Sequence, residues 1–139
     1  QIISSKDKFL KLGSLSPTRD FNYVEDICSG YELALKANNI FGETINLGSG
    51  YETSIKDMVF LISMLMQRDV KVDKSSERIR PAKSEVNRLC ASNNKAKKLL
   101  NWKPKFVGKK GLKKGLLKTI DWYRKNSDLK EFDRKLYVI

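Results

Sequence analysis

The sequence has 139 residues, with 28 Lys and Arg against 16 Asp and Glu, which gives a formal net charge of +12. A chain of this length buries roughly two-thirds of its unfolded surface, so one domain can pack without disulfides or metals. The absence of His excludes Ser–His and Cys–His nucleophile pairs, His metal ligands and an imidazole base. No apolar run approaches the ~20 residues of a membrane span, so we expect a soluble protein without a membrane partner.

The excess of positive charge indicates an anionic partner, which can be nucleic acid, anionic lipid or a phosphorylated small molecule. Arginine-rich stripes and aromatic stacking platforms are missing, so a solvated lysine surface is favoured over a nucleic-acid interface. Cys28 and Cys90 lie in apolar sequence contexts without a metal-ligand pattern, which predicts reduced core thiols and a cytoplasmic location. The sequence starts without Met and without a signal-peptide pattern, so we expect a fragment or a processed product.

The first predicted elements surround Arg19. Residues 9–12 form a short alternating pattern that predicts a strand ending at Gly13. After a turn-rich stretch, residues 21–24 favour a second short strand. Arg19 therefore stands at the mouth of a strand-to-helix unit, where phosphate groups commonly bind. These residues alone favour the plainer alternative of a solvated turn arginine.

A helix is predicted next. The acids Glu25 and Asp26 suit the positive end of a helix dipole, so the helix begins near residue 24, and apolar spacing carries it to residues 38–39. Residues 44–47 then predict another strand. We expect residues 21–47 to form a strand, helix and strand unit with parallel strands and a right-handed crossover.

The turn at residues 48–50 has the sequence Gly-Ser-Gly, which fits a phosphate cradle, although a plain tight turn is favoured over it. Thr53 or Ser54 then caps a core-facing helix over residues 55–66, with Asp57 as a variant of the capping box.

The middle of the chain is predicted to be more irregular. Residues 70–73 alternate as a short strand, and a loop over residues 74–81 ends at a proline. Arg80 precedes that proline, so its backbone is extended and its side chain is not absorbed into a helix face. Residues 85–90 follow as a strand or an extended segment.

Two further helices complete the pattern. Residues 92–94 supply cap residues for a short basic helix that ends at Leu100. Trp102 is available to plug the core, and a long helix runs from about residue 109 to residue 125. The remainder, residues 127–139, is a polar tail with an apolar end. The expected fold is a small mixed α/β lobe of short strands and about four helices, with too little sheet for a complete doubly wound domain.

Four motifs in fixed order carry a resemblance to a known family. They are Arg19 to Asp26, Ile45 to Gly50 leading into Thr53 to Ile55, Arg80-Pro81 followed by Ser84 to Val86, and Lys95 to Pro104. Together they resemble the C-terminal part of an NAD-dependent epimerase/dehydratase, an extended short-chain dehydrogenase/reductase, here without its Rossmann half. The match covers residues 1–126. Within this superfamily the motifs are most similar to nucleoside-diphosphate-sugar 4,6-dehydratases of the UDP-N-acetylglucosamine type in legionaminic acid synthesis.

The resemblance implies a role for each matching residue. Arg19 and Arg80 inherit contacts with the substrate pyrophosphate, and planar guanidinium groups suit phosphate oxygens. Glu85 corresponds to the acid that accepts from the nucleotide ribose hydroxyls. Leu10, Lys11 and Leu12 match the strand beside the nucleobase. At Ser92, relatives usually carry an Asp as the helix cap, and serine caps adequately.

The family binds NAD and performs its chemistry through motifs that this sequence lacks. No Gly-x-x-Gly-x-x-Gly occurs, and none of the five tyrosines has Lys four positions later. We therefore expect the chain alone neither to hold NAD nor to transfer hydride, with no catalytic residue or metal of its own. The expected partners are a nucleoside-diphosphate sugar, the N-terminal Rossmann half and, in the full-length enzyme, a second copy as a homodimer. A 4-epimerase, a basic nucleic-acid-binding module and a non-catalytic interaction module are the alternatives.

Overall fold

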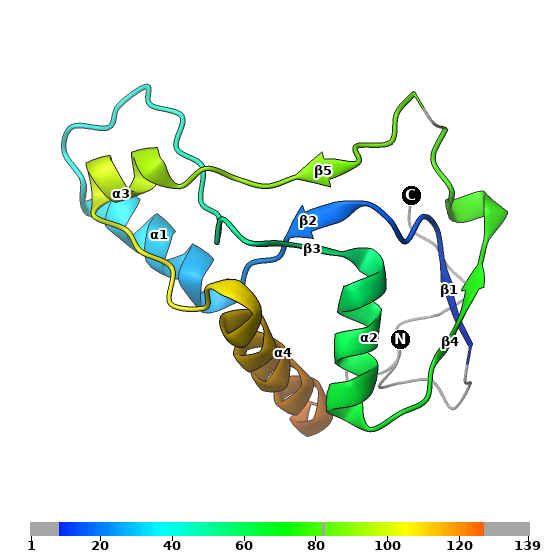
Figure 1. Ribbon diagram of the computed structural model, residues 1–139. Coiled ribbons are helices and arrows are strands. Elements are labelled where there is room, and N and C mark those ends of the chain that lie inside the picture. Colours follow the sequence, from blue (N-terminus) through cyan, green and yellow to red (C-terminus); the bar gives the residue numbers. More distant parts are fainter. Residues whose placement is uncertain (1–8, 82, 127–139) are drawn as a thin grey trace.

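The computed structural model describes residues 9–81 and 83–126 and shows a lobe of helices and short strands (Figure 1). The helices are α1 (Val24–Lys36), α2 (Ile55–Met66), α3 (Asn94–Leu100) and α4 (Gly108–Lys125). The strands are β1 (Phe9–Leu12), β2 (Thr18–Asp20), β3 (Glu52–Ser54), β4 (Lys71–Lys74) and β5 (Arg88–Leu89). The expected small α/β lobe with four helices is confirmed. The tail predicted at residues 127–139 lies outside the described residues.

The strands form two separate small sheets. In the first, β1 pairs with β4 in parallel. In the second, β2 is central, antiparallel to β3 and parallel to β5. Figure 1 shows the second sheet crossing between α1 and α3 on one side and the β1–β4 pair on the other. The central position of β2 matters for the site, because Arg19 is its middle residue.

The strand predicted over residues 21–24 is wrong, because the strand lies at residues 18–20. Asn22 is in an extended link in which its side-chain amide donates to the Asp20 carbonyl at 3.2 Å. The ladder partner β3 lies opposite residues 18–20, and β5 lies opposite residues 18 and 19. The β-favouring side chains therefore belong to the link between strand and helix. The helix begins at Val24 as predicted and ends at Lys36, earlier than expected, because Ala37 is already extended.

The strand predicted over residues 44–47, with its parallel crossover, is also wrong. This segment has no ladder partner among the described residues. Its alternation is real, since Ile45 and Leu47 are half-buried and pack on the core around Trp102 while Thr44 and Asn46 are exposed. The antiparallel strand β3, five residues further on, pairs with β2 instead. An alternating pattern reports which face is buried, whereas pairing needs a partner edge.

Trp102 fills the core between α1 and α3, as predicted. It is 1% exposed and forms a cluster with Ala96 and Leu100. Its indole N–H donates to the Asp26 carbonyl and to Ser29 Oγ, each at 3.0 Å. A buried indole of this size contributes a large apolar area and needs a partner for its N–H, and both conditions are met here.

The remaining predictions of helices and strands hold with small shifts in their bounds. Ser54 caps α2, because its Oγ accepts from the Asp57 N–H at 3.0 Å and donates to the Asp57 carboxylate at 2.7 Å.

Strand β4 starts one residue later than expected, and only Arg88 and Leu89 of residues 85–90 form a strand. The loop before Arg80 includes a 3₁₀ turn, η1 (Ser76–Arg78). Asn93, not Ser92, is the N-cap of α3, and no side-chain cap bond forms there. No helix in the described part of the chain is long and apolar enough to cross a bilayer.

Candidate functional site

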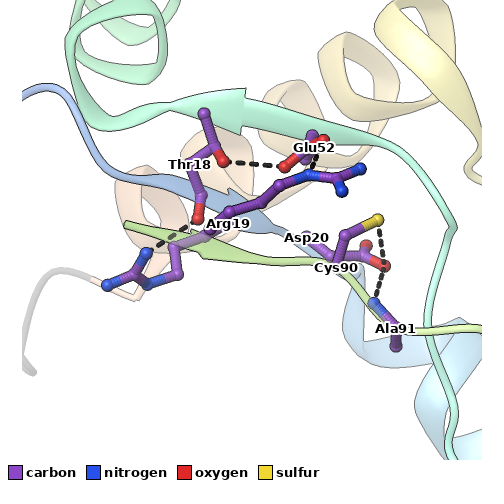
Figure 2. Close-up of polar contacts among 7 residues, drawn as sticks. Thr18, Arg19, Asp20, Glu52, Cys90 and Ala91 are labelled. Atoms are coloured by element: carbon purple, nitrogen blue, oxygen red, sulfur yellow. Dashed lines mark hydrogen bonds and ion pairs between the residues drawn. The ribbon is translucent and has the colours of Figure 1, made fainter. Parts of the chain in front are cut away.

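Arg19 and Glu85 face one another beside β2. The Arg19 Nη2 lies 3.3 Å from the Glu85 Oε1, and the Arg19 Nη1 donates to the Thr18 carbonyl at 2.7 Å. Both side chains are partly buried, at 23% and 16% exposure. Figure 2 shows the Arg19 side chain leaving the strand on the side opposite the Thr18 side chain. A guanidinium has five N–H donors, so donors remain that can bind an oxyanion brought to this face.

The other face of the sheet carries a small polar network around Glu52. The Glu52 carboxylate accepts from the Thr18 hydroxyl at 2.7 Å and from the Arg88 Nε at 2.6 Å (Figure 2). The Thr18 hydroxyl bond and the Arg88 guanidinium lower the pKa of this carboxyl. The Glu52 carboxylate of β3 therefore links its own strand to β2 and to β5 on one face of the sheet.

Asp20, the last residue of β2, binds the Gly-Ser-Gly turn. Its carboxylate accepts from the Ser49 N–H at 3.1 Å, the Ser49 hydroxyl at 2.5 Å and the Gly50 N–H at 3.0 Å. It also accepts from the Ala91 N–H at 3.3 Å. Two backbone donors of the turn are thus taken by a carboxylate of the same chain. This supports the plain-turn interpretation of residues 48–50 over the phosphate cradle.

The predicted nucleobase strand is β1, and Arg78 is one of the residues that contact it. Leu10 is buried, and the Lys11 carbonyl accepts from the Arg78 Nη1 at 2.8 Å. The Leu12 carbonyl accepts from the Ser75 N–H at 2.9 Å. Arg80 lies two residues beyond Arg78, exposed in a stretch without regular secondary structure. The structure therefore joins Arg19 to Glu85 and β1 to residues 75–78, whereas no hydrogen bond or ion pair joins Arg80 to Glu85 among the described residues.

The prediction that both cysteines are core thiols is wrong for Cys28, which is exposed on α1. Gly30 faces Leu47, and two residues turn a helix by about 200°, so Cys28 points away from that contact. Cys90 is half-buried, with its sulfur 3.9 Å from the Asp20 carboxylate. Burial raises the pKa of the Cys90 thiol, and the Asp20 and Glu52 carboxylates add to the effect.

A surface hollow of about 500 Å³ lies elsewhere, between α2 and β4. Its walls are mostly apolar and include Val59, Phe60 and Met64. None of the six predicted site residues lines it. Lys56 and Arg68 also line the hollow, so its walls are not purely apolar.

Sequence reasoning missed three residues that shape this region, namely Asp20, Glu52 and Arg78. In the sequence, Asp20 stands out only as part of a motif, and no local pattern marks Glu52 or Arg78. Their partners lie 29 to 71 residues away along the chain, so no local pattern marks them.

The sequence matches a family model over residues 1–115, that of GDP-mannose 4,6 dehydratase. The chain belongs to this family. The UDP-glucuronate 4-epimerase of Thermodesulfobacterium geofontis is 32% identical over 126 residues, which cover 89% of this chain and 36% of that protein. The chain therefore spans about a third of the length of that curated relative.

Solved structures of similar proteins give the same picture of this family's fold. The UDP-glucuronic acid 4-epimerase of Bacillus cereus, in complex with UDP-4-deoxy-4-fluoro-glucuronic acid and NAD, is 27% identical with a TM-score of 0.72. That match covers 90% of this chain and 37% of the solved chain. The dTDP-glucose 4,6-dehydratase of Bacillus anthracis, in complex with NAD, is 26% identical with a TM-score of 0.69, and covers 86% and 35%. The lobe thus matches the C-terminal part of such enzymes.

Proposed function

We propose that this chain is the substrate-binding lobe of an NAD-dependent enzyme that acts on a nucleoside-diphosphate sugar. The observation that carries the proposal is the Arg19–Glu85 pair. It places a guanidinium with spare donors next to a carboxylate on one face of β2. A diphosphate needs the first group and a ribose diol needs the second. The family match supports the same substrate class.

Within this proposal each predicted residue keeps its own role. Arg19 and Arg80 bind the pyrophosphate, each charged contact contributing roughly 1.5–3 kcal/mol. Glu85 accepts from the ribose hydroxyls, and residues 10–12 flank the nucleobase through their backbone. On substrate binding, part of the Arg19–Glu85 contact is exchanged for contacts with the diphosphate and the ribose.

NAD, when bound by the complete enzyme, accepts and returns the hydride that the sugar chemistry needs. The residues of this chain do not fit that cofactor. The one glycine-rich turn in the described part, at residues 48–50, already gives its Ser49 and Gly50 N–H groups to the Asp20 carboxylate. We therefore propose that the N-terminal Rossmann half supplies the NAD site.

For the reaction we propose 4,6-dehydration, on the strength of the Arg80-Pro81 and Ser84 to Val86 motifs. The alternative is 4-epimerisation, the activity of two of the similar proteins, the epimerases of Thermodesulfobacterium geofontis and Bacillus cereus. The two outcomes differ in composition, because dehydration removes one water from the sugar while epimerisation keeps its mass. Mass spectrometry of the product from the complete enzyme therefore distinguishes them. We place the enzyme in the cytoplasm as a homodimer, to be checked by fractionation and light scattering.

Calorimetry tests the binding role on the 139-residue chain, with UDP-glucuronic acid, UDP-glucose and GDP-mannose as ligands and NAD as the comparison. We expect a nucleoside-diphosphate sugar to bind and NAD not to bind. Arg19→Gln and Arg80→Ala each weaken that binding by about tenfold or more, as the loss of one charged contact requires. Arg124→Ala, an exposed cation near the end of α4, is the control with unchanged affinity. Unchanged affinity in Arg80→Ala removes Arg80 from the site.

The DNA upstream of the codon for Gln1 tests the enzyme half of the proposal. We expect it to encode a Gly-rich turn after a first strand and a Tyr-x-x-x-Lys pair. An upstream half without these motifs points to the alternative of a non-catalytic interaction module.

A second candidate is a basic nucleic-acid-binding module, and one observation favours it. Residues 86–120 hold eleven of the 28 Lys and Arg residues and none of the 16 Asp and Glu residues, so nearly all of the net charge is concentrated there. Lys109, Lys110, Lys113 and Lys114 are all exposed on α4. Changing these four to Gln should abolish retention on duplex DNA if the module exists. The charge-matched control changes Lys36, Lys56, Lys71 and Lys74, and an equal loss there makes the retention non-specific.

A further inference from the structure

The Asp20 carboxylate connects three segments that are far apart in the sequence. It belongs to β2 and accepts from the Ser49 N–H, the Ser49 hydroxyl and the Gly50 N–H of the turn before β3. It also accepts from the Ala91 N–H, two residues beyond β5, and lies beside the Cys90 thiol (Figure 2). With four N–H or O–H donors already bound, its oxygens are not available as a general base or a metal ligand.

The ladder that this carboxylate closes is very short. Strand β5 pairs with β2 only at Thr18 with Arg88 and at Arg19 with Leu89. One further backbone bond, from the Thr18 N–H to the Asn87 carbonyl at 2.9 Å, extends it. A slip of one residue in such a ladder turns every side chain to the other face. Two residue pairs and one further backbone bond give this register little support, so side-chain contacts matter to it.

Side-chain contacts hold the ladder at both ends. At the start of β2, the Glu52 carboxylate binds Thr18 and Arg88. At the end of β2, Asp20 binds Ala91. Glu85 lies three residues before β5, so the β2–β5 register decides whether its carboxylate meets Arg19.

We propose that Asp20 is a positioning residue for the nucleoside-diphosphate-sugar site, which acts by fixing the β2–β5 register that brings Glu85 to Arg19. This inference rests on the proposed function. It gives the acid next to Arg19 a role distinct from substrate contact. It also explains why residue 48 is a glycine. An added Cβ there would lie 2.8 Å from the Asp20 Oδ2 and 2.4 Å from the Ala91 Cβ. Glycine allows the three segments to approach this closely.

A double-mutant cycle tests the role by calorimetry on the 139-residue chain, with UDP-glucuronic acid and UDP-glucose as probes. Asp20→Asn replaces a carboxylate, which only accepts, by an amide with one acceptor oxygen and an NH₂ group. The NH₂ group would face N–H and O–H groups that now donate to the carboxylate. We expect it to weaken binding about tenfold when Arg19 is present. In the Arg19→Gln background the same change should weaken binding less than about twofold. The guanidinium that the register brings together with Glu85 is then absent.

Asp26→Asn is the matched control, since the Asp26 carboxylate also accepts from two backbone N–H groups, but from those of residues 105 and 106 rather than from the turn or the β5 segment. We expect it to lower the melting temperature and leave the affinity unchanged. If Asp20→Asn does not fold, Ser49→Ala replaces it in the cycle, because it removes one hydroxyl donor and leaves the carboxylate. For this variant we expect a loss of about threefold that depends on Arg19 in the same way.

The outcomes separate the two claims. If the parent chain binds neither probe, the proposed function falls, and the positioning role falls with it. If the parent binds and Asp20→Asn or Ser49→Ala weakens binding equally in both backgrounds, or not at all, the positioning role is overturned while the proposed function stands.

Discussion

The Asp26 carboxylate accepts a hydrogen bond at 2.9 Å from the backbone N–H of Phe106, 80 residues further along the chain. Its other oxygen accepts from the Lys105 N–H at 2.8 Å, and the side chain is almost fully buried. A first-turn acid of α1 therefore also anchors the segment that leads into α4. Helix α1 has no side-chain cap at Tyr23, so this acid serves tertiary structure more than capping.

Asp26→Asn should destabilise the lobe by about 1–3 kcal/mol, because an amide has one acceptor oxygen and leaves a buried N–H without a partner. Chemical denaturation with urea measures the change. Asp57→Asn, at an exposed acid near the start of α2, is the comparison and should have a smaller effect. Equal losses in the two variants would mean that the Asp26 bonds to the N–H groups of residues 105 and 106 add nothing to the stability of the lobe.

Trp102→Phe should cost about 1–3 kcal/mol, since it removes the indole N–H bonds to Asp26 and Ser29 and leaves a gap in the core. Trp122→Phe is the control on the same residue type. Trp122 is 50% exposed on α4, so its change should stay within about 0.5 kcal/mol. Thermal unfolding of both variants checks the difference. Similar melting temperatures for the two would contradict a core role for Trp102.

Acid should weaken the three-stranded sheet through Glu52. The Thr18 hydroxyl bond and Arg88 hold the pKa of this carboxyl below its ordinary value near 4.5. A lowered folded-state pKa means that the contribution is fully present above the unfolded value and is lost as the pH falls through the folded value. NMR titration should show the depressed midpoint. Stability between about pH 6 and pH 3 should fall less steeply in Glu52→Gln, and an unchanged slope would remove Glu52 from the network.

Gly48→Ala should destabilise the lobe by about 1–3 kcal/mol, because the new Cβ would lie 2.4 Å from the Ala91 Cβ. Adding Ala91→Gly removes that atom and should restore about half of the loss. Urea denaturation of the two single variants and the double variant gives the coupling. Strict additivity would show that the close approach of these two backbones is not the cause.

Helix α2 was predictable from the sequence because its signals are local. Ser54, Asp57 and the apolar spacing over residues 55–66 lie within one stretch, and the cap bonds form as predicted. The order of the sequence motifs also predicted the superfamily, which the match to the family model over residues 1–115 supports. Positions for Arg19 and Glu85 followed from the motifs, although the contact between them did not.

Strand pairing and the roles of the two central acids were decided by tertiary structure. Residues 21–24 and 44–47 have β-favouring sequences, yet the ladders form at residues 18–20 and 52–54, because pairing depends on which edges meet. Asp20 and Asp26 look alike in the sequence motif, and only the fold brings Ser49, Ala91 and Phe106 to them. Sequence determined the helices because their hydrogen bonds close within four residues. Contacts between residues 29 to 80 positions apart exist only after the chain has packed.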